Sequence, residues 1–413
     1  MKQLSFVLSL LLALFCASPA AAQKRIFIPE DLQKMNLEAD TSQWCWKRSA
    51  QTRDVIFFWE RGFGSDLQAP PPLEGKPMAF NLSVLMERVQ SFYTFFRDTL
   101  GFVNGENSKA DRYKMMVMVM YSLDGTAYGG TYDNFIGALW VAPNRIQDKT
   151  MNCMAHELGH SFQLQIPADS VGDAWGGTGF FEMTSQWMLW QVNPWWLRDE
   201  NYHFEAFKGL THKAYLHLDN IYHSPYVIQW WSDLHGRKSI AQLYREGRIG
   251  EDPVITYKRL YGLTQQQFCD EMFRGYQHLV NFDFKHARQE TRPYACTWTT
   301  PLDTLAGGWL RPKNVPEDYG FNIIPLPTDR PVSVRVKGKN LRWGLVGVTP
   351  DGQTIYGAPQ VSRLSSPALS LQHLYLVVMG APTDHRSLRM PTEADPNPQN
   401  QQRQYPYKFK INP

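Results

Sequence analysis

Apolar residues recur every three or four positions between residues 81 and 100, the spacing of one face of an α-helix. Asn81 is a suitable N-cap for this helix, and Gly101 is a suitable residue to end it. Shorter, nearly unbroken apolar runs have the length and composition of buried strands. These runs occupy residues 54–59, 114–122 and 135–141. The first third of the chain therefore predicts one long helix and a small sheet, with Gly129-Gly130 interrupting the chain between the last two strands.

Helical spacing dominates the middle of the chain. Helices are predicted over residues 150–164, from about residue 180, and over 225–246 and 264–281. Thr264 and Gln267 are spaced as a capping box, which places the start of the last helix. A glycine-rich stretch at 172–179 separates the first two helices and is predicted to be a loop.

After about residue 290 the pattern changes to short apolar runs separated by turn residues, with no long helix between them. Strands are predicted at residues 332–336, 341–348, 354–356, 374–379 and 405–411. This arrangement is typical of a small all-β domain, and we expect a sandwich. The whole pattern predicts an α+β chain with a lead-in segment (23–50), a mostly helical domain with a small mixed sheet (51–290) and a C-terminal β domain (291–413).

The N-terminus has the three parts of a cleavable secretory signal. Lys2 supplies a basic start, residues 4–15 are apolar, and Ala20-Ala21-Ala22 offers a small-residue cleavage site before Gln23. The apolar stretch is shorter than the roughly 20 residues that cross a bilayer, and no later stretch qualifies. We expect residues 1–22 to be removed near Ala22/Gln23, which leaves a soluble, secreted or periplasmic protein without a transmembrane segment.

The overall composition argues against a nucleic-acid partner. Lys and Arg number 42 against 39 Asp and Glu, and the basic residues are scattered along the 413 positions instead of being clustered. Four cysteines follow the predicted signal, at positions 45, 153, 269 and 296. They include no C-x-x-C pair, which argues against a cysteine zinc site, and three disulfide pairings stay open.

The candidate chemistry lies in the helix predicted over residues 150–164. His156 and His160 are four positions apart, so both imidazoles project from one face and can reach one Zn²⁺ at about 2.0–2.1 Å. Glu157 follows the first histidine directly and projects beside the metal, where its carboxylate can take a proton from water. The pattern H-E-x-x-H therefore predicts a zinc metallopeptidase with Glu157 as general base. Two ordinary helix histidines are the alternative interpretation.

A catalytic zinc ion needs a third protein ligand and one open position. The extended three-histidine motif is excluded, because Gln163 and Ile166 stand where it needs glycine and histidine. Glu182, flanked by bulky apolar residues at the start of the next predicted helix, would be costly to bury without a cation and is our candidate third ligand. A solvent-facing glutamate in the first helical turn is the alternative, and Asp169 and Asp173 are the fallback ligands.

The order of these elements, with strands before the H-E-x-x-H helix and a glutamate on the next helix, resembles the gluzincin clan of zinc peptidases. Longer strings resemble the Svx/AvrXca-like family of secreted bacterial proteins across most of the mature chain. They lie at residues 137–141, 156–163, 181–186, 250–254, 266–272 and 374–382. The segment 156–163 is also similar to the enhancin-like peptidases, which attack mucin-type glycoproteins.

This resemblance implies a zincin-like fold for the helical domain and a role for each matching position. His156, His160 and Glu182 would hold one zinc ion, and Glu157 would act as the base. In gluzincins an edge strand upstream of the metal helix pairs with the substrate backbone. The residues in that place are Gly137, Ala138, Leu139 and Trp140, although an interior strand fits the same sequence.

The resemblance also implies a residue that stabilises the oxyanion, because gluzincins use a Tyr or a His downstream of the third ligand. Tyr222 and His223 are the best placed by spacing. The rival positions are His203, His212 and His217, and each of these residues also fits an ordinary surface or core position.

The sequence as a whole favours a secreted, monomeric zinc endopeptidase that acts on extracellular proteins or glycoproteins. One alternative is a catalytically silent protein that binds glycan or protein, although an intact Glu157 argues against it. Another alternative is a zinc hydrolase of a non-peptide amide, such as a cell-wall or sugar amide.

Overall fold

A computed structural model shows an α+β chain built from helices and three β-sheets, as the sequence predicts. The structure describes residues 23–103, 107–125, 127–176, 178–364, 370–398 and 402–412. The predicted signal peptide, residues 1–22, lies outside these ranges. None of the described helices combines the length and the apolar character that a bilayer crossing needs.

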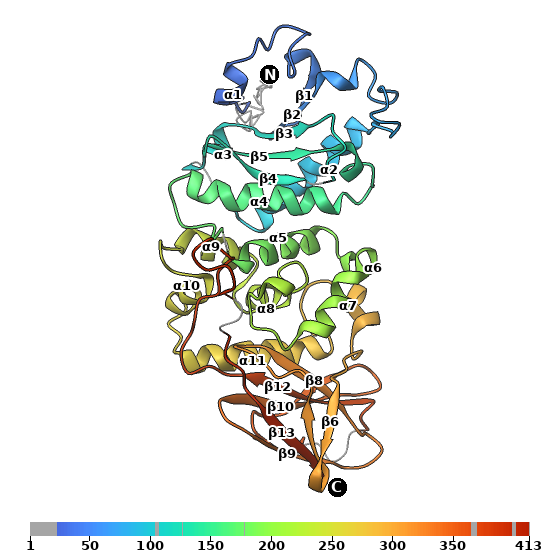
Figure 1. The fold of residues 1–413 in the computed structure, drawn as a ribbon, viewed down its shortest axis with the longest axis vertical. Helices are drawn as coiled ribbons and strands as arrows, with labels where there is room; N and C mark the ends of the chain where they lie inside the picture. The colour runs from blue at the N-terminus through green and yellow to red at the C-terminus, as the bar shows by residue number, and fades with distance from the viewer. Residues whose placement is uncertain are drawn as a thin grey trace, which may run out of the picture.

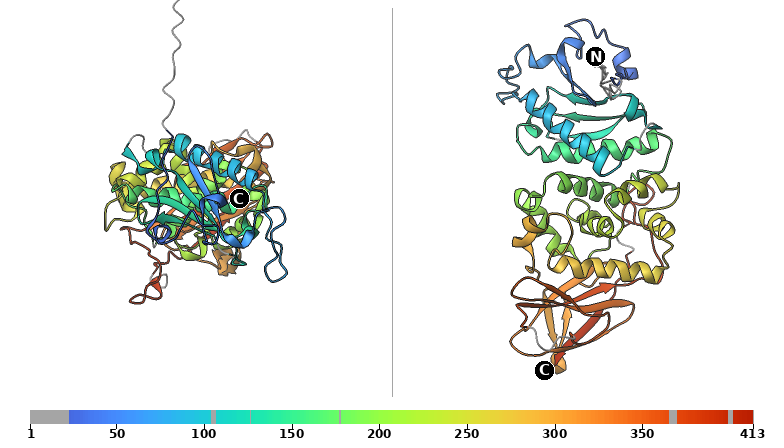
Figure 2. Two further views of the ribbon diagram at one scale, coloured as in Figure 1. Left: turned by 90° about the horizontal axis from the view of Figure 1, so that it is seen from above. Right: turned by 180° about the vertical axis from the view of Figure 1, so that it is seen from behind.

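The three sheets and the helices follow one another along the long axis of the molecule. Figure 1 shows a five-stranded sheet, then a layer of helices, then two four-stranded sheets. The view from behind in Figure 2 shows the same order, with β1 and the C-terminal sheets at opposite ends. The helices α4 (Asn152–Ala168) and α5 (Gly179–Val192), which carry the candidate ligands, lie where the first sheet meets the helical layer.

The first sheet is mixed, and its order is β1-β2-β3-β5-β4. The strands are β1 (Ser49–Gln51), β2 (Val55–Trp59), β3 (Met115–Val119), β4 (Tyr128–Tyr132) and β5 (Ile136–Val141). β2, β3 and β5 run parallel, whereas β1 and β4 are antiparallel edge strands. β2 and β3 are almost entirely buried, which explains their unbroken apolar sequences. The three predicted strands are confirmed, and the structure adds β1 and β4.

Helices α2 and α4 pack on this sheet. α2 (Leu82–Thr94) begins where Asn81 accepts a hydrogen bond from Val84 N, so the predicted cap is confirmed. A π-helical turn, Phe95–Thr99, continues it almost to Gly101. α2 packs on β2 and on α4, and α4 packs on β4 and β5. Two short helices complete this part of the chain: α1 (Glu30–Gln33) precedes β1, and α3 (Lys109–Arg112) precedes β3.

The helical layer starts with α5. Its other helices are α6 (Trp196–Asp199), α7 (Asn201–Leu210), α8 (Tyr226–His235), α9 (Lys238–Glu246), α10 (Pro253–Leu260), α11 (Gln265–Val280) and α12 (Arg288–Thr291). The single helix predicted over 225–246 is wrong, because Gly236 takes a φ of 89° and separates α8 from α9. The capping box is confirmed, since Thr264 and Gln267 each accept from the other's backbone N–H.

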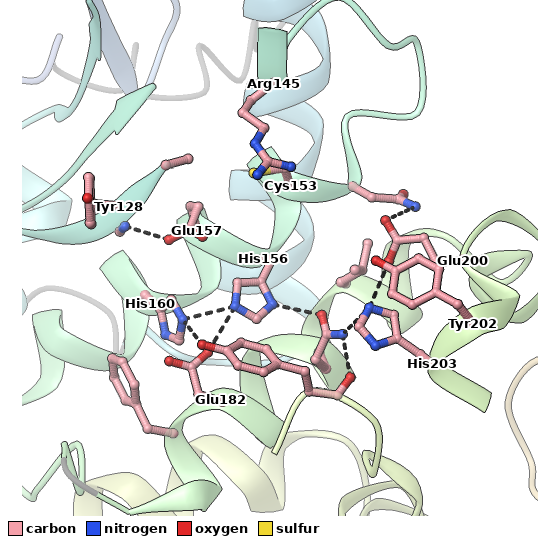
Figure 3. A pocket seen from close by; sticks show the side chains of 17 residues that line it. Tyr128, Arg145, Cys153, His156, Glu157, His160, Glu182, Glu200, Tyr202 and His203 are labelled. Atoms are coloured by element: carbon pink, nitrogen blue, oxygen red, sulfur yellow. Dashed lines mark hydrogen bonds and ion pairs between the residues drawn. The ribbon is translucent and has the colours of Figure 1, made fainter. Parts of the chain in front are cut away.

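Short 3-10 turns join several of these elements. They lie at Trp46–Arg48, Arg61–Phe63, Pro143–Arg145, Leu218–Asn220, Arg292–Tyr294 and Ala306–Gly308. The turn at Pro143–Arg145 ends β5 and places Arg145 above the first turn of α4, as Figure 3 shows.

The C-terminal strands form two antiparallel sheets. One sheet has the order β11-β10-β12-β8 and the other β6-β7-β13-β9. The strands are β6 (Leu302–Leu305), β7 (Trp309–Pro312), β8 (Phe321–Leu326), β9 (Ser333–Gly338), β10 (Leu341–Val348), β11 (Thr354–Tyr356), β12 (His373–Gly380) and β13 (Tyr407–Asn412). The five predicted strands are confirmed, and β6, β7 and β8 are additions.

The sheet that contains β12 is buried on both faces. Leu376 and Val378 point into a small apolar cluster that also takes residues from β9 and β13 of the other sheet. Val377 and Met379, on the opposite face, belong to the main core, together with residues of α11. Because successive side chains of a strand alternate between faces, this double burial accounts for the continuous apolar sequence of β12. The boundary at residues 290 and 291 stays a prediction.

Candidate metal centre

Close packing between α4 and α5 brings the candidate ligands together. A Cβ atom at Gly159 would lie 2.5 Å from Ser185 Oγ, so the glycine between the two histidines lets α5 approach α4. At the start of α5, a Cβ atom at Gly179 would lie 2.6 Å from Leu216 O. Gly159 therefore lets the histidine helix approach the helix that carries Glu182, and Gly179 lets the segment 216–221 approach the start of that second helix.

The three candidate ligand atoms lie within hydrogen-bond distance of one another. His160 Nε2 is 3.0 Å from His156 Nε2, and both nitrogens are 3.1 Å from Glu182 Oε2 (Figure 3). Both histidines are buried, and Glu182 is half-buried. These three residues form the only group among the described residues whose His, Cys, Asp or Glu atoms are arranged to hold a metal ion.

Two glutamines hold the histidine rings from behind. Gln186 Oε1 lies 2.8 Å from His156 Nδ1, and its Nε2 donates to the carbonyl oxygen of Tyr222 at 2.7 Å. Gln163 Oε1 lies 2.8 Å from His160 Nδ1, and its Nε2 donates to the carbonyl oxygen of Phe181 at 2.8 Å. A carbonyl oxygen can only accept, so each amide group must present its NH₂ to the carbonyl and its oxygen to the histidine.

This orientation decides which nitrogen of each ring carries the proton. Each Nδ1–H donates to a glutamine oxygen, so each Nε2 presents a lone pair. Two lone pairs and a carboxylate oxygen then face one another at 3.0–3.1 Å, an arrangement that repels unless a positive charge lies between them. Two imidazoles and one carboxylate are a zinc ligand set that leaves one position open, so the residues present fit the predicted ion.

Titration of these groups reflects the same need for positive charge. Burial opposes protonation of His156, but its hydrogen bond with Glu182 and the charge of Glu157 outweigh that effect and raise its pKa. Burial opposes ionisation of Glu182, but its hydrogen bonds with both histidines outweigh that effect and lower its pKa. Asp169 and Asp173, the fallback ligands, bond to Lys109 N and Trp175 N instead and do not join the cluster.

Glu157 lies between the ligand cluster and the edge strand β4. Its Oε2 accepts a hydrogen bond of 2.7 Å from Gly129 N (Figure 3). A Cβ atom at Gly129 would lie 1.8 Å from the carbonyl oxygen of Glu157, so only glycine allows this approach. The prediction that Gly129-Gly130 interrupts the chain is therefore wrong. Both glycines lie within β4, and the missing side chain of Gly129 lets β4 pack closely against α4.

We expect Gly129→Ala to destabilise the fold strongly, because the new methyl group meets backbone that belongs to α4. Overpacking of this kind costs about 1–3 kcal/mol or more of unfolding free energy. Gly130→Ala is the matched control, since its Cβ would approach Trp140 Cζ3 no closer than 3.4 Å. Urea unfolding of both variants checks this, and equal stability of the two would contradict the described contact.

The predicted substrate strand is not an edge strand. β5, which carries Gly137, Ala138, Leu139 and Trp140, pairs with β3 on one side and β4 on the other. Its backbone also bonds to α4, since Ser161 Oγ donates to Ala138 O and Gly137 N donates to Gln165 Oε1. Its amides and carbonyls are thus engaged within the protein. β4 pairs with β5 and is the last strand in the sheet order. The edge of the sheet beside Glu157 is therefore β4.

The structure separates the two candidate oxyanion residues. Tyr222 lines the pocket over the ligand cluster, and its ring centroid lies 6.0 Å from that of His156. His223 does not line this pocket but lies against His203, with 2.6 Å between the two Nδ1 atoms. Among the rival histidines, only His203 is a lining residue. His217 instead caps a 3-10 turn by accepting from Asp219 N.

The pocket above the cluster has a volume of about 530 Å³. Besides the ligands and Glu157, it is lined by residues that the sequence analysis did not single out: Tyr128, Arg145, Asn152, Cys153, Phe181, Gln186, Leu189, Glu200 and Tyr202. The most exposed tyrosines among the described residues, Tyr202, Tyr128 and Tyr222, all belong to this pocket. Three exposed aromatic rings therefore border the pocket.

The four described cysteines are free, so no disulfide contributes to this site. Cys153 lines the pocket, and burial, followed by the charge of Glu157, raises its pKa to about 12. Its thiol is therefore neutral at physiological pH. A neutral thiol is a poor nucleophile and a poor zinc ligand.

Comparisons with known proteins give a family and several distant structural likenesses. Among solved structures, the ZmpB metallopeptidase from Clostridium perfringens matches at 13% identity and a TM-score of 0.34, covering 82% of this chain and 67% of that one. The M60 catalytic domain from Clostridium perfringens ZmpC, in complex with the sialyl T antigen, matches at 14% identity and a TM-score of 0.33, covering 86% and 73%.

No curated protein matches the chain. A family model does match, over residues 18–413, and its description is "Family of unknown function (DUF6055)". This match covers all of the elements described above. The chain therefore belongs to the DUF6055 family.

Proposed function

We propose that this chain is a secreted zinc endopeptidase that hydrolyses peptide bonds of extracellular proteins or glycoproteins. The observation that carries the proposal is the ligand cluster, in which two imidazole lone pairs and the Glu182 carboxylate converge within 3.1 Å beside Glu157. A bound Zn²⁺ would act as a Lewis acid on the scissile carbonyl and lower the pKa of water to about 7. His156, His160 and Glu182 would hold it.

Glu157 is placed to act as general base. Its carboxylate lines the pocket, and the hydrogen bond from Gly129 N fixes one oxygen. The other oxygen is free to accept a proton from the attacking water and to return it to the leaving amine. The rigid backbone donor keeps the carboxylate aimed into the pocket in the absence of substrate.

The edge strand β4 is the candidate for the substrate backbone. It pairs with β5 on one side only and borders the pocket through Tyr128 and Gly129. An extended peptide can add to such an edge as a further strand, which supplies main-chain hydrogen bonds without regard to sequence. The exposed rings of Tyr128, Tyr202 and Tyr222 would then contact its side chains or attached sugars.

Tyr222 is the candidate donor to the oxyanion. Burial, followed by the charges of Glu182 and Glu157 and a hydrogen bond with Glu182, raises the pKa of Tyr222 to about 12. The hydroxyl is therefore protonated at neutral pH and able to donate. His223, held against His203 outside the pocket, is not in a position to take this role.

We expect Tyr222→Phe to lower kcat by about 10²–10³-fold, the usual cost of removing one oxyanion donor, with KM nearly unchanged. Zinc content should stay at the wild-type level, because the substitution leaves the three ligands in place. Tyr202→Phe, which removes a different hydroxyl of the same pocket, should retain kcat. Steady-state kinetics on one fluorogenic peptide would check both variants, and wild-type kcat in Tyr222→Phe would assign the oxyanion donor elsewhere.

Metal analysis paired with product analysis tests the function itself. Purified protein should hold about one zinc ion and release peptides from casein or mucin, with cleavage positions read by mass spectrometry. Zinc binding without cleavage would favour the silent binding protein. Release of a sugar or cell-wall amide from peptidoglycan, with intact casein and mucin, would favour a non-peptide amide hydrolase.

The domain organisation belongs to the same proposal. Residues 51–290 would form the peptidase domain and residues 291–413 a β unit that docks on it through α11. Secretion through the predicted signal at residues 1–22 would deliver the enzyme to its substrates outside the cytoplasm. N-terminal sequencing of the exported protein, with Gln23 expected as the first residue, checks the cleavage site.

A further inference from the structure

Gln186, which orients His156, is itself held by two groups. Its Nε2 donates to the carbonyl oxygen of Tyr222 at 2.7 Å and lies 3.3 Å from His203 Nε2. An amide NH₂ has two hydrogens, so it can serve both acceptors at once. The orientation that gives its oxygen to His156 therefore also requires His203 Nε2 to accept a hydrogen bond.

The proton of His203 must then lie on its other nitrogen. His203 is buried, and burial together with the nearby His223 and His156 lowers its pKa to about 3, so its ring is neutral at physiological pH. A neutral imidazole that accepts at Nε2 carries its proton on Nδ1. His203 Nδ1 lies 2.6 Å from His223 Nδ1, so it donates there, and His223 Nδ1 accepts.

One competing arrangement would reverse this order. Glu200 Oε2 lies 3.6 Å from His203 Nε2 and would attract a proton on that nitrogen. This separation is beyond a hydrogen bond, and the same carboxylate oxygen already accepts from Trp196 Nε1 at 2.8 Å. A proton on His203 Nε2 would also point at the NH₂ of Gln186. The contacts thus favour His203 as acceptor from Gln186.

We propose that His203 and His223 act as positioning residues for the metal centre, because together with the Tyr222 carbonyl they hold the amide of Gln186 and, through it, the tautomer of His156. The inference rests on the proposed metal site but not on the proposed peptidase activity. If the amide turned over, its NH₂ would face His156 Nδ1, the ring proton would move to Nε2, and the ligand lone pair would be lost. His160 has no such dependence, since Gln163 is held by Phe181 O and Tyr244 Oη, which carry no imidazole.

Zinc affinity of the full-length apoprotein, measured by competition with a chelator, tests this. We expect His203→Phe, which keeps an aromatic ring but removes the acceptor, to weaken zinc binding by about 10–100-fold, the usual effect of losing an outer-shell partner. His203→Gln can present an amide oxygen near the Nε2 position and should recover most of the affinity. Tyr202→Phe is the control, since its ring lies against His203 with 4.2 Å between ring centroids but its hydroxyl has no part in the described chain of hydrogen bonds.

A second measurement reads the tautomer directly. In the ¹⁵N NMR spectrum of the metal-free protein, recorded at a pH above the raised pKa of His156 so that its ring is neutral, His156 should carry its proton on Nδ1, and the spectrum of His203→Phe should show a population protonated on Nε2. His223→Leu should also produce a population of His156 protonated on Nε2. Because His223 is only half-buried, this substitution is the less disruptive of the two for the fold. His160 should keep its proton on Nδ1 in both variants, because Gln163 holds that tautomer independently.

The outcomes separate this inference from the proposed function. Wild-type zinc affinity in His203→Phe, with His156 still protonated on Nδ1, would overturn the positioning role and leave the metal site standing. Equal losses in His203→Phe and His203→Gln would also overturn it, because they would point to packing and not to the acceptor. Failure of the wild-type protein to bind zinc would overturn the metal site itself.

Discussion

Glu182→Ala is expected to abolish zinc binding and, with it, all hydrolysis. The carboxylate supplies the only acidic atom of the ligand cluster, and its removal leaves two neutral imidazoles at 3.0 Å. The loss of affinity should exceed the roughly 10–100-fold that outer-shell substitutions cost, because a ligand itself is removed. Metal content after dialysis and competition with a chelator would measure the effect.

The fallback aspartate gives a matched control for this experiment. Asp173→Asn should retain zinc, because Asp173 lies outside the cluster and an asparagine oxygen can still accept from Trp175 N. Circular dichroism should show that both variants are folded. Wild-type zinc affinity in Glu182→Ala would contradict the proposed third ligand, and zinc loss in Asp173→Asn would point to a different coordination set.

Glu157→Gln should keep the metal and lose turnover. The glutamine oxygen can still accept from Gly129 N, so the side chain should remain in place, but an amide cannot take a proton from water. General-base catalysis contributes about 10²–10⁴-fold, and we expect a loss of kcat in that range or above it. KM for a peptide substrate should change little, since the pocket keeps its shape.

Zinc stoichiometry of Glu157→Gln, measured on the same preparation, is the control for this loss. One zinc ion per chain with no turnover is the expected pair of results. Full activity in the variant would remove Glu157 from the mechanism. Loss of zinc together with activity would leave its role as base undecided by kinetics, so the metal-loaded variant must be compared with the metal-loaded wild type at equal zinc content.

The ligand spacing could be predicted from sequence because it depends on one local element. Two residues four apart on a helix share a face in any fold, so His156 and His160 required no knowledge of tertiary structure. The sequence could name Glu182 only as one of several carboxylates able to join the two histidines, with Asp169 and Asp173 as the fallback residues. The helix crossing that decides it depends on the close approach of Gly159 to Ser185, which lies on another helix and is distant in sequence.

The position of β4 could not be predicted, because the residues that make it possible resemble a break. A Gly-Gly pair lowers the propensity for a strand, and only the approach of α4 explains why glycine is required at position 129. The apolar run of β5 is typical of a buried strand and gave no information about which neighbour lies at the edge. The pocket residues Glu200 and Tyr202 belong to a segment without a sequence motif, so only the structure shows that they line the pocket.

The two glutamines that contact the candidate ligand histidines had a weaker signal in the sequence. Gln163 follows His160 by three positions, and Gln186 follows Glu182 by four, so each lies about one turn from a ligand. That spacing places an amide near a metal-binding face but does not say which atom it presents. The carbonyl oxygens that fix the amide orientation, at Phe181 and Tyr222, belong to other segments.

The sheet that contains β8, β10 and β12, which is buried on both faces, has a practical consequence for biochemical work on this protein. A fragment that stopped before β8 would strip apolar cover from α11, where the ring of Tyr276 stacks on Phe321 at 3.8 Å. Such a fragment would expose apolar surface of α11 to water and would be prone to aggregate. Recombinant expression should therefore retain the strands through β13, because inactivity of a shortened chain would not test the proposed catalytic residues.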